Sequence, residues 1–197
     1  DLLHDALPVS RTRRTTKPAN DGTSGALSVG QSSLWFLNRI DPGDSTYNVV
    51  VAMRCRARLD AETVRRTLQT LVDRHAALRT TFGEVSGIPI QRVHASDTVD
   101  FAVARHDTNA DWLREQLAAA GDAPFDLERG PLFRGRLLGD VDDDVLVMAC
   151  HHIVADFWSL AVILEEFAAV YERLASGRAP DLAPLKWPRP RKGSPID

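Results

Sequence analysis

Residues 145–160 read Val145-Leu-Val-Met-Ala-Cys150-His151-His152-Ile-Val-Ala-Asp156-Phe157-Trp158-Ser159-Leu160. The continuous apolar run that opens this stretch, preceded by the acidic turn 142–144, predicts a strand buried on both faces. From Phe157 onward the apolar positions recur every three or four residues, as an amphipathic helix requires; they are Leu160, Ile163, Leu164, Phe167, Val170, Tyr171 and Leu174. The two histidines therefore lie where a core strand ends and a helix begins.

The rest of the sequence alternates strand and helix signals. A helix is expected to begin near Gln31, and the other expected helices are Ala61–Ala77, with Asp60 as its cap, and Asp111–Ala120. The expected strands are Tyr47–Arg58, Leu78–Phe82, Ile88–His94, Phe101–Arg105 and Leu132–Leu138. A hairpin through Gly83 and Gly87 is expected to join the second strand to the third, and Leu132–Leu138 is expected to pair with the central strand. This order predicts an α/β fold with helices packed on a mixed sheet.

The adjacent histidines are the first candidates for chemistry. Successive side chains of a strand point to opposite faces, so His151 and His152 are expected to lie in different environments, one inward and one toward a cleft. An imidazole has an ordinary pKa near 6.5 and is the usual side chain for moving a proton at neutral pH. The alternative is a purely structural hydrogen-bonding pair.

The motif around the histidines resembles the HHxxxDG core of the condensation-domain superfamily of non-ribosomal peptide synthetases. Three upstream segments resemble further motifs of that family in the expected order: residues 27–37 (Leu-Ser-Val-Gly-Gln-Ser-Ser-Leu-Trp-Phe-Leu), residues 74–82, which match every fixed position of RHxxLRTxF, and residues 124–132. The resemblance covers about residues 27–175. Four motifs in order make coincidence an inadequate explanation.

The resemblance implies a chloramphenicol-acetyltransferase-like fold, in which two lobes enclose a reaction channel. Family members run about twice this length, so residues 27–178 are expected to be the N-terminal lobe only. Residues 1–26 have no apolar periodicity beyond residue 10 and are expected to be a linker or flexible arm. Residues 179–197, rich in proline and basic residues near their end, resemble the start of the linker between lobes.

The resemblance also implies a mechanism and partners. Acyl or peptidyl carrier domains bring thioester-bound groups on phosphopantetheine arms, and an amine or hydroxyl acceptor attacks the donor thioester. His152 would act as a general base or position the acceptor, and His151 would support it structurally. Asp156 is expected to form an ion pair with an arginine of the RHxxLR motif, Arg79 in preference to Arg74. No cofactor is expected to be bound by the domain itself.

One position departs from the family motif. The glycine that follows the aspartate is Phe157 here, so a bulky aromatic replaces a residue with free backbone geometry at the mouth of the site. Phe157, together with Trp158 and Ser159, is expected to line or gate the channel, or Phe157 simply packs as the first apolar residue of the following helix. Peptide-bond formation, ester formation and a gating function all stay open.

Other chemistries fit the sequence less well. Cys150 and His152 share one face of the strand, as a nucleophile pair would, but a cysteine after an apolar run usually behaves as a small hydrophobic residue. Metal binding is not expected, because adjacent strand residues diverge and no cluster supplies the remaining ligands. A coenzyme A-dependent O-acyltransferase of the same superfamily and a non-catalytic lobe that docks carriers remain as alternatives.

Composition narrows the class of protein. The 197 residues are 44% hydrophobic and 26% charged, which is enough to bury a core as one domain. The net charge of −3 argues against a nucleic-acid partner, and no apolar run is long enough to span a membrane. With only Cys55 and Cys150, free thiols in the reducing cytoplasm are expected. The isolated chain is expected to fold but to show no turnover, because half of the channel is absent.

Overall fold

The computed structural model describes residues 23–95, 97–105, 110–139 and 143–185. Its elements in chain order are β1 (Ser24–Ala26), α1 (Val29–Ile40), β2 (Asn48–Cys55), α2 (Ala61–Arg74), a 3₁₀ turn (Ala76–Arg79), β3 (Thr80–Val85), β4 (Ile88–Val93), β5 (Asp100–Arg105), α3 (Ala110–Asp122), β6 (Phe133–Gly139), β7 (Asp144–His151) and α4 (Phe157–Ala175). The expected α/β alternation is confirmed.

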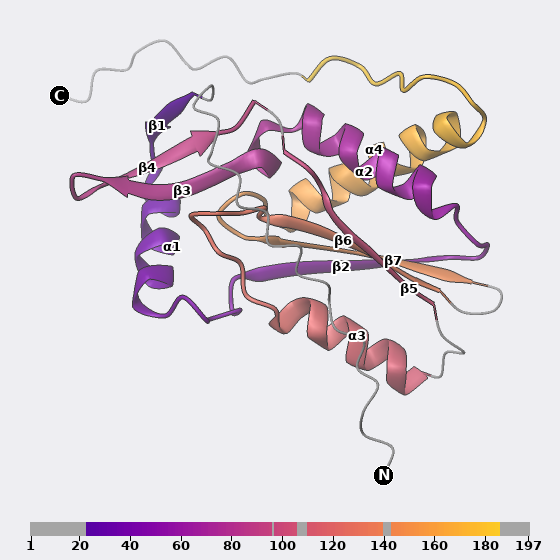
Figure 1. Ribbon diagram of the computed structural model, residues 1–197, viewed down its shortest axis with the longest axis horizontal. Coiled ribbons are helices and arrows are strands. Elements are labelled where there is room, and N and C mark those ends of the chain that lie inside the picture. Colours follow the sequence, from indigo (N-terminus) through magenta and orange to yellow (C-terminus); the bar gives the residue numbers. More distant parts are fainter. Residues whose placement is uncertain (1–22, 96, 106–109, 140–142, 186–197) are drawn as a thin grey trace.

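The strands form two sheets (Figure 1). The larger has the order β2-β7-β6-β5, in which β5 and β6 are parallel and the other pairs antiparallel. The smaller has the order β1-β4-β3 and lies beside α1 at one end of the molecule. In Figure 1, α2 and α4 cover one face of the larger sheet and α3 covers the other. This mixed sheet between helices is the architecture that the sequence predicts.

Every residue of strand β7 is buried, and the strand contributes to three hydrophobic clusters, one of them through Ala149, which packs with Phe82 and Phe125. Its alternate residues Leu146, Met148 and Cys150 pack with the buried stripes of α2 and α4. Val145 and Val147 face the opposite way and pack against α3. The uninterrupted apolar run of β7 thus follows from its place between two layers of helix.

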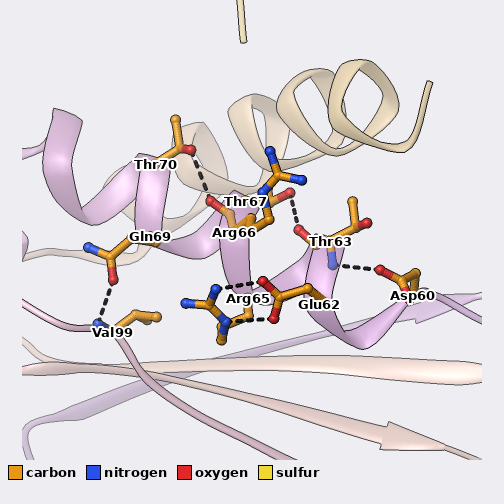
Figure 2. A network of polar contacts seen from close by, with 9 residues as sticks. All are labelled: Asp60, Glu62, Thr63, Arg65, Arg66, Thr67, Gln69, Thr70 and Val99. Carbon is orange, nitrogen blue, oxygen red and sulfur yellow. Dashed lines mark hydrogen bonds and ion pairs between the residues drawn. The ribbon is translucent and has the colours of Figure 1, made fainter. Parts of the chain in front are cut away.

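Helix α2 shows how local sequence sets the ends and the position of an element (Figure 2). Asp60 Oδ2 accepts a hydrogen bond of 2.7 Å from the amide of Thr63 and so caps the helix. On the exposed face, Glu62 and Arg65 form a two-pronged ion pair with contacts of 2.8 and 2.6 Å. Gln69 Oε1 accepts from the amide of Val99 at 3.1 Å, which ties the helix to the segment that enters β5.

Several boundaries differ from the sequence-based expectation. The helix expected over Ala61–Ala77 ends at Arg74, and a short 3₁₀ turn follows it. Gly83 lies inside β3, whereas Ser86 and Gly87, with φ of 52° and 80°, make the turn to β4. This turn requires the left-handed backbone region at both of its central positions, which favours glycine at the second.

The described residues of the expected linker and tail contact the rest of the domain. Ser24–Ala26, inside the expected linker 1–26, forms β1 and pairs with Ile90–Arg92 of β4. After α4, Arg173 Nε donates to the carbonyl of Ala179 at 2.6 Å, and Leu182 packs on the main core. The expected tail therefore begins with a segment that packs on the domain; this segment, residues 179–185, is called the strap below. Residues 1–22 and 186–197 of the two segments lie outside the described residues.

Candidate active site

Backbone hydrogen bonds from both neighbouring strands fix the end of β7. The amide of His151 donates to the carbonyl of Leu132 at 3.2 Å, just before β6. The amide of His152 donates to the carbonyl of Tyr47 at 2.8 Å, just before β2. The amide of Val154 then donates back to the carbonyl of His151 at 3.0 Å. The turn that follows β7 is thus anchored on both sides before the chain enters α4.

His151 points into the protein, with 1% of its surface exposed. Its Nδ1 lies 3.1 Å from the amide nitrogen of Ile153. Because an amide donates, Nδ1 is the acceptor and Nε2 carries the proton. The rings of Tyr47 and Phe125 flank the imidazole, each with a centroid distance of 6.4 Å. Burial, followed by the charge of His152, lowers the pKa of His151 to about 4, so this imidazole is neutral near pH 7.

This depressed pKa predicts a specific loss of stability in acid. Below its ordinary pKa of 6.5 the unfolded chain binds a proton at His151, whereas the folded chain does not until about pH 4. The free energy of unfolding should therefore fall by roughly 3 kcal/mol as the pH drops through this window. The variant His151→Asn keeps an acceptor oxygen but does not titrate. In urea unfolding at several pH values, its free energy of unfolding should therefore fall less between pH 6.5 and pH 4 than that of the wild type. An equal fall for the two proteins would contradict the prediction.

His152 is exposed on the other side of the chain. Its Nδ1 lies 3.3 Å from the carbonyl oxygen of Ala155. Because a carbonyl only accepts, the neutral ring carries its proton on Nδ1 and presents the lone pair of Nε2 outward. The turn therefore holds an imidazole whose free nitrogen can accept a proton from a bound molecule.

Asp156 closes the turn as the cap of α4. Its Oδ1 accepts hydrogen bonds from the amide of Ser159 at 2.7 Å and from the Ser159 hydroxyl at 2.6 Å. These bonds, the side-chain bond first, hold the pKa of Asp156 below its ordinary value. In the described part of the chain Asp156 makes no ion pair with Arg79 or Arg74, so the expected pairing is wrong for this structure.

The two arginines are held elsewhere. Arg74 Nε lies 3.2 Å from Glu166 of α4, whose other oxygen lies 2.6 Å from His75 Nε2. A further nitrogen of Arg74 donates to the carbonyl of Ala183 at 2.5 Å, which ties the strap to both helices. Arg79 donates to the backbone carbonyl of His94 in the strand region beside β3. Each guanidinium thus binds a partner away from the N-terminus of α4. This is why neither arginine forms the ion pair with Asp156 that the sequence predicts.

The cap predicts the effect of replacing Asp156. Asp156→Ala should lower the free energy of unfolding by about 1 kcal/mol near pH 7, because it removes the acceptor for the first turn of α4. A carboxyl whose folded pKa is lowered stabilises the protein fully above its unfolded pKa near 4, so the difference should shrink as the pH falls from there through the lower folded pKa. Denaturant titrations at pH 7 and pH 3 measure this. Asp156→Ser, which keeps a capping oxygen, is the control and should lose only a few tenths of a kcal/mol.

Comparison with known proteins decides the family. Residues 23–187 match the family model described as the condensation domain. This chain belongs to the condensation-domain family. The resemblance that the four sequence motifs indicate is therefore confirmed.

Its relatives include large synthetases. The chain is 42% identical over 167 residues to one of the linear gramicidin synthase proteins of Brevibacillus parabrevis, a match that covers 81% of this chain and 2% of that protein. It is 38% identical over 163 residues to the isonitrile lipopeptide synthase of Mycobacterium tuberculosis, covering 81% of this chain and 6% of that protein. The chain thus spans only a small part of the curated relatives that it matches.

Solved structures show the same fold. The starter condensation domain of rhizomide synthetase matches with a TM-score of 0.76 at 24% identity, over 84% of this chain and 42% of that chain. A chain in the complex of the X-domain and OxyB from teicoplanin biosynthesis matches with a TM-score of 0.76 at 31% identity, over 87% of this chain and 36% of that chain. The expected chloramphenicol-acetyltransferase-like fold is confirmed, and the chain spans less than half of either solved chain.

The residues after the family's aspartate begin α4 of this condensation domain. Phe157 and Trp158 are 68% and 77% exposed, so neither is packed in the core of the described structure. The interpretation of Phe157 as an ordinary buried helix residue is therefore wrong here. Ser159 is engaged by the cap, both through its amide and through its hydroxyl. The substitution of glycine by Phe157 thus places a large aromatic side chain at the surface directly after the histidine turn.

Neither alternative chemistry gains support from the structure. Burial raises the pKa of the Cys150 thiol to about 12, so almost no thiolate forms near neutral pH and a Cys150–His152 nucleophile pair is not formed. Among the described residues no group of three histidine, cysteine or carboxylate side chains is placed to hold a metal ion. No helix within the described ranges combines the length and apolar character needed to cross a membrane.

Four contributors to the site were missed from the sequence. Tyr47 and Phe125 flank His151, while Asn48 and Arg134 bind the loop that carries Phe125. Tyr47 and Asn48 lie where β2 begins, Phe125 lies in the loop after α3 and Arg134 lies in β6, and only the fold brings these three segments together. A usable signal was Arg134, a charged residue in the otherwise apolar start of a core strand.

Proposed function

We propose that this chain is the N-terminal, histidine-bearing lobe of a carrier-protein-dependent condensation domain in non-ribosomal peptide or hybrid polyketide biosynthesis. The observation that carries the proposal is His152, an exposed imidazole at the end of a buried strand with Nε2 directed outward. Membership of the condensation-domain family supports it. The cytoplasm is the proposed compartment, because Cys55 and Cys150 are both free thiols.

The proposed reaction is acyl transfer between two thioester-bound partners. The lone pair of the acceptor amine or hydroxyl attacks the carbonyl carbon of the donor thioester, and the carbon–sulfur bond breaks. The proton of the acceptor passes to His152 Nε2, or His152 only orients the acceptor by a hydrogen bond. The departing thiolate of the donor phosphopantetheine arm gains a proton. Phosphopantetheine therefore belongs to the carrier domains and is not a cofactor held by this lobe.

A second lobe is part of the proposal. His152, Phe157 and Trp158 are all exposed, so no described residue covers their side chains. We place the C-terminal lobe of the same domain over this surface, where the two lobes enclose the channel. The isolated chain is therefore inactive, and turnover by it alone would refute the two-lobe arrangement.

The experiment uses a polypeptide that carries this chain with its second lobe and flanking carriers. The carriers are loaded with acyl and aminoacyl thioesters, and products are followed by mass spectrometry for wild type and His152→Ala. Loss of a product that wild type makes supports condensation, and the product mass distinguishes an amide from an ester. A coenzyme A-dependent O-acyltransferase would instead use free acyl-coenzyme A without loaded carriers.

Phe157 favours a second candidate function, in which the lobe gates the channel or docks carriers without catalysing a reaction. Phe157 is exposed directly after the histidine turn, and the proposal is that its ring narrows the mouth of the channel, which a gate or a docking lobe without chemistry would tolerate. In that case neither wild type nor His152→Ala forms product while the carriers stay loaded. Phe157→Gly tests the gate directly, because restoring product formation or widening the range of acyl groups accepted would assign that effect to the aromatic ring.

A further inference from the structure

The loop between α3 and β6 is held by two side chains from separate strands. Asn48 of β2 donates through Nδ2 to the carbonyls of Gly121 and Ala123 at 2.6 and 2.9 Å. Arg134 of β6 donates from one nitrogen to the carbonyl of Ala123 at 3.1 Å and from the other to Pro124 at 2.9 Å. Strands β2 and β6 flank β7 on its two sides, so the loop is clamped across the strand that ends in the histidines.

This clamp places Phe125 against His151. The guanidinium of Arg134 lies 3.7 Å from the centroid of the Phe125 ring, which is buried. The ring then meets the imidazole of His151 edge to face, at an angle of 88°. His151 accepts the amide of Ile153, the residue after His152. A continuous set of contacts therefore runs from Arg134 through Phe125 and His151 to the turn that presents His152.

The clamp also leaves polar atoms without partners. Within the described ranges, Asn48 Oδ1 and Arg134 Nε are buried and make no hydrogen bond. Leaving a buried polar atom without a hydrogen-bond partner lowers the stability of the folded state. Apolar side chains that simply filled this space would avoid the cost, but they would supply no donors to the loop carbonyls. The donors are thus kept at the expense of stability, as is common beside functional sites.

We infer that Arg134 and Asn48 are positioning residues, which set the orientation of His152 through the end of α3, the loop that follows it, Phe125 and His151. The inference rests on the proposed function, because it assigns them an effect on the reaction at His152. Neither residue touches the acceptor or the thioester. Their contribution is to keep the histidine turn in one arrangement, and a misplacement of about 1 Å at a reacting group can lower a rate about 100-fold.

Arg134→Lys is the decisive variant. A lysine keeps the positive charge, but its single ammonium cannot reproduce the planar fork that reaches two carbonyls while lying over Phe125. In the two-lobed polypeptide with a loaded donor carrier, we expect the maximal rate to fall about 10-fold, with half-saturation by an aminoacyl N-acetylcysteamine thioester unchanged within about twofold. Hydrogen exchange of residues 151–155 should accelerate, while exchange in residues 145–150 stays slow.

Arg136→Lys is the matched control. Arg136 lies two residues along the same strand and pairs with Asp100 at 2.9 Å, away from the histidine turn. Its replacement should leave the rate and the exchange of residues 151–155 unchanged. If Arg134→Lys does not fold, Asn48→Ser makes the same test from β2, because it removes the donors to Gly121 and Ala123. A purely structural contribution would lower the unfolding midpoint without selective exchange in residues 151–155.

The outcomes separate this inference from the proposed function. If His152→Ala is inactive while Arg134→Lys and Asn48→Ser both turn over at the wild-type rate, the positioning inference is overturned and the condensation proposal stands. If His152→Ala is as active as wild type, the proposed function fails regardless of Arg134. A selective loss of rate in both positioning variants, with the Arg136→Lys control unaffected, supports the inference.

Discussion

His152→Ala is expected to lower the rate of product formation at least 100-fold in the complete domain with loaded carriers. General base or hydrogen-bond assistance by a positioned imidazole contributes about 100-fold to 10,000-fold to such reactions. The fold should not suffer, because the side chain is exposed and its one hydrogen bond in the described structure is the 3.3 Å contact with Ala155. Mass spectrometry of product, together with the extent of carrier loading, measures the effect.

A second substitution at this position separates the two mechanisms. His152→Gln retains a side-chain oxygen that can accept a hydrogen bond but cannot take up a proton at neutral pH. If His152 is a general base, the glutamine variant should be as slow as the alanine variant. If His152 only orients the acceptor, the glutamine variant should recover part of the rate. A His152→Ala variant with full activity would remove His152 from the mechanism altogether.

Phe167→Ala is expected to have the largest effect on stability. Phe167 is 2% exposed in the middle of α4, where it packs in the main core and stacks on Tyr171 with a centroid distance of 5.8 Å. Truncating a buried phenylalanine removes its apolar contacts and leaves a cavity, at a cost of about 3–5 kcal/mol. This is a large part of the roughly 5–15 kcal/mol that typically stabilises a domain. Urea unfolding followed by circular dichroism measures the loss.

Phe36→Ala is the matched control for this prediction. Phe36 lies on α1 with 60% of its surface exposed, so its removal should change the free energy of unfolding by no more than about 0.5 kcal/mol. Comparable losses for the two variants would show that α4 does not anchor the core as the structure indicates.

The sequence predicts the central parts of this fold well because their signals are local. The apolar run before His151 and the stripe from Leu160 to Leu174 both follow from the requirement that one face or both faces be buried. The alternation of a strand predicts opposite environments for the two histidines, and they do differ, although His152 lies one residue past the end of β7. These features depend only on residues that are close together in the sequence, so a short stretch of sequence is enough to predict them.

The contacts that sequence patterns could not supply join distant segments. Arg74 pairs with Glu166, 92 positions away, and Asn48 binds the carbonyl of Gly121, 73 positions away. Neither partner has a local signature, because a carboxylate on a helix and a backbone carbonyl are both common. The same limitation explains why the sequence suggests an arginine partner for Asp156, although Ser159, three residues along, donates both of its hydrogen bonds to Asp156 Oδ1.

Strand β7 is buried up to His151, and His152, the next residue, is exposed. Substitutions on the two sides of this boundary are therefore expected to have different effects. Substitutions before this boundary are expected to act on the amount of folded protein, whereas under the proposed function substitutions at His152 act on the reaction of molecules that remain folded. If the proposed function holds, a lineage can abolish the chemistry of this domain by a single change at His152 and still keep the fold. An inactive descendant would be free to serve as a binding surface, and its loss of activity would leave no trace in its stability.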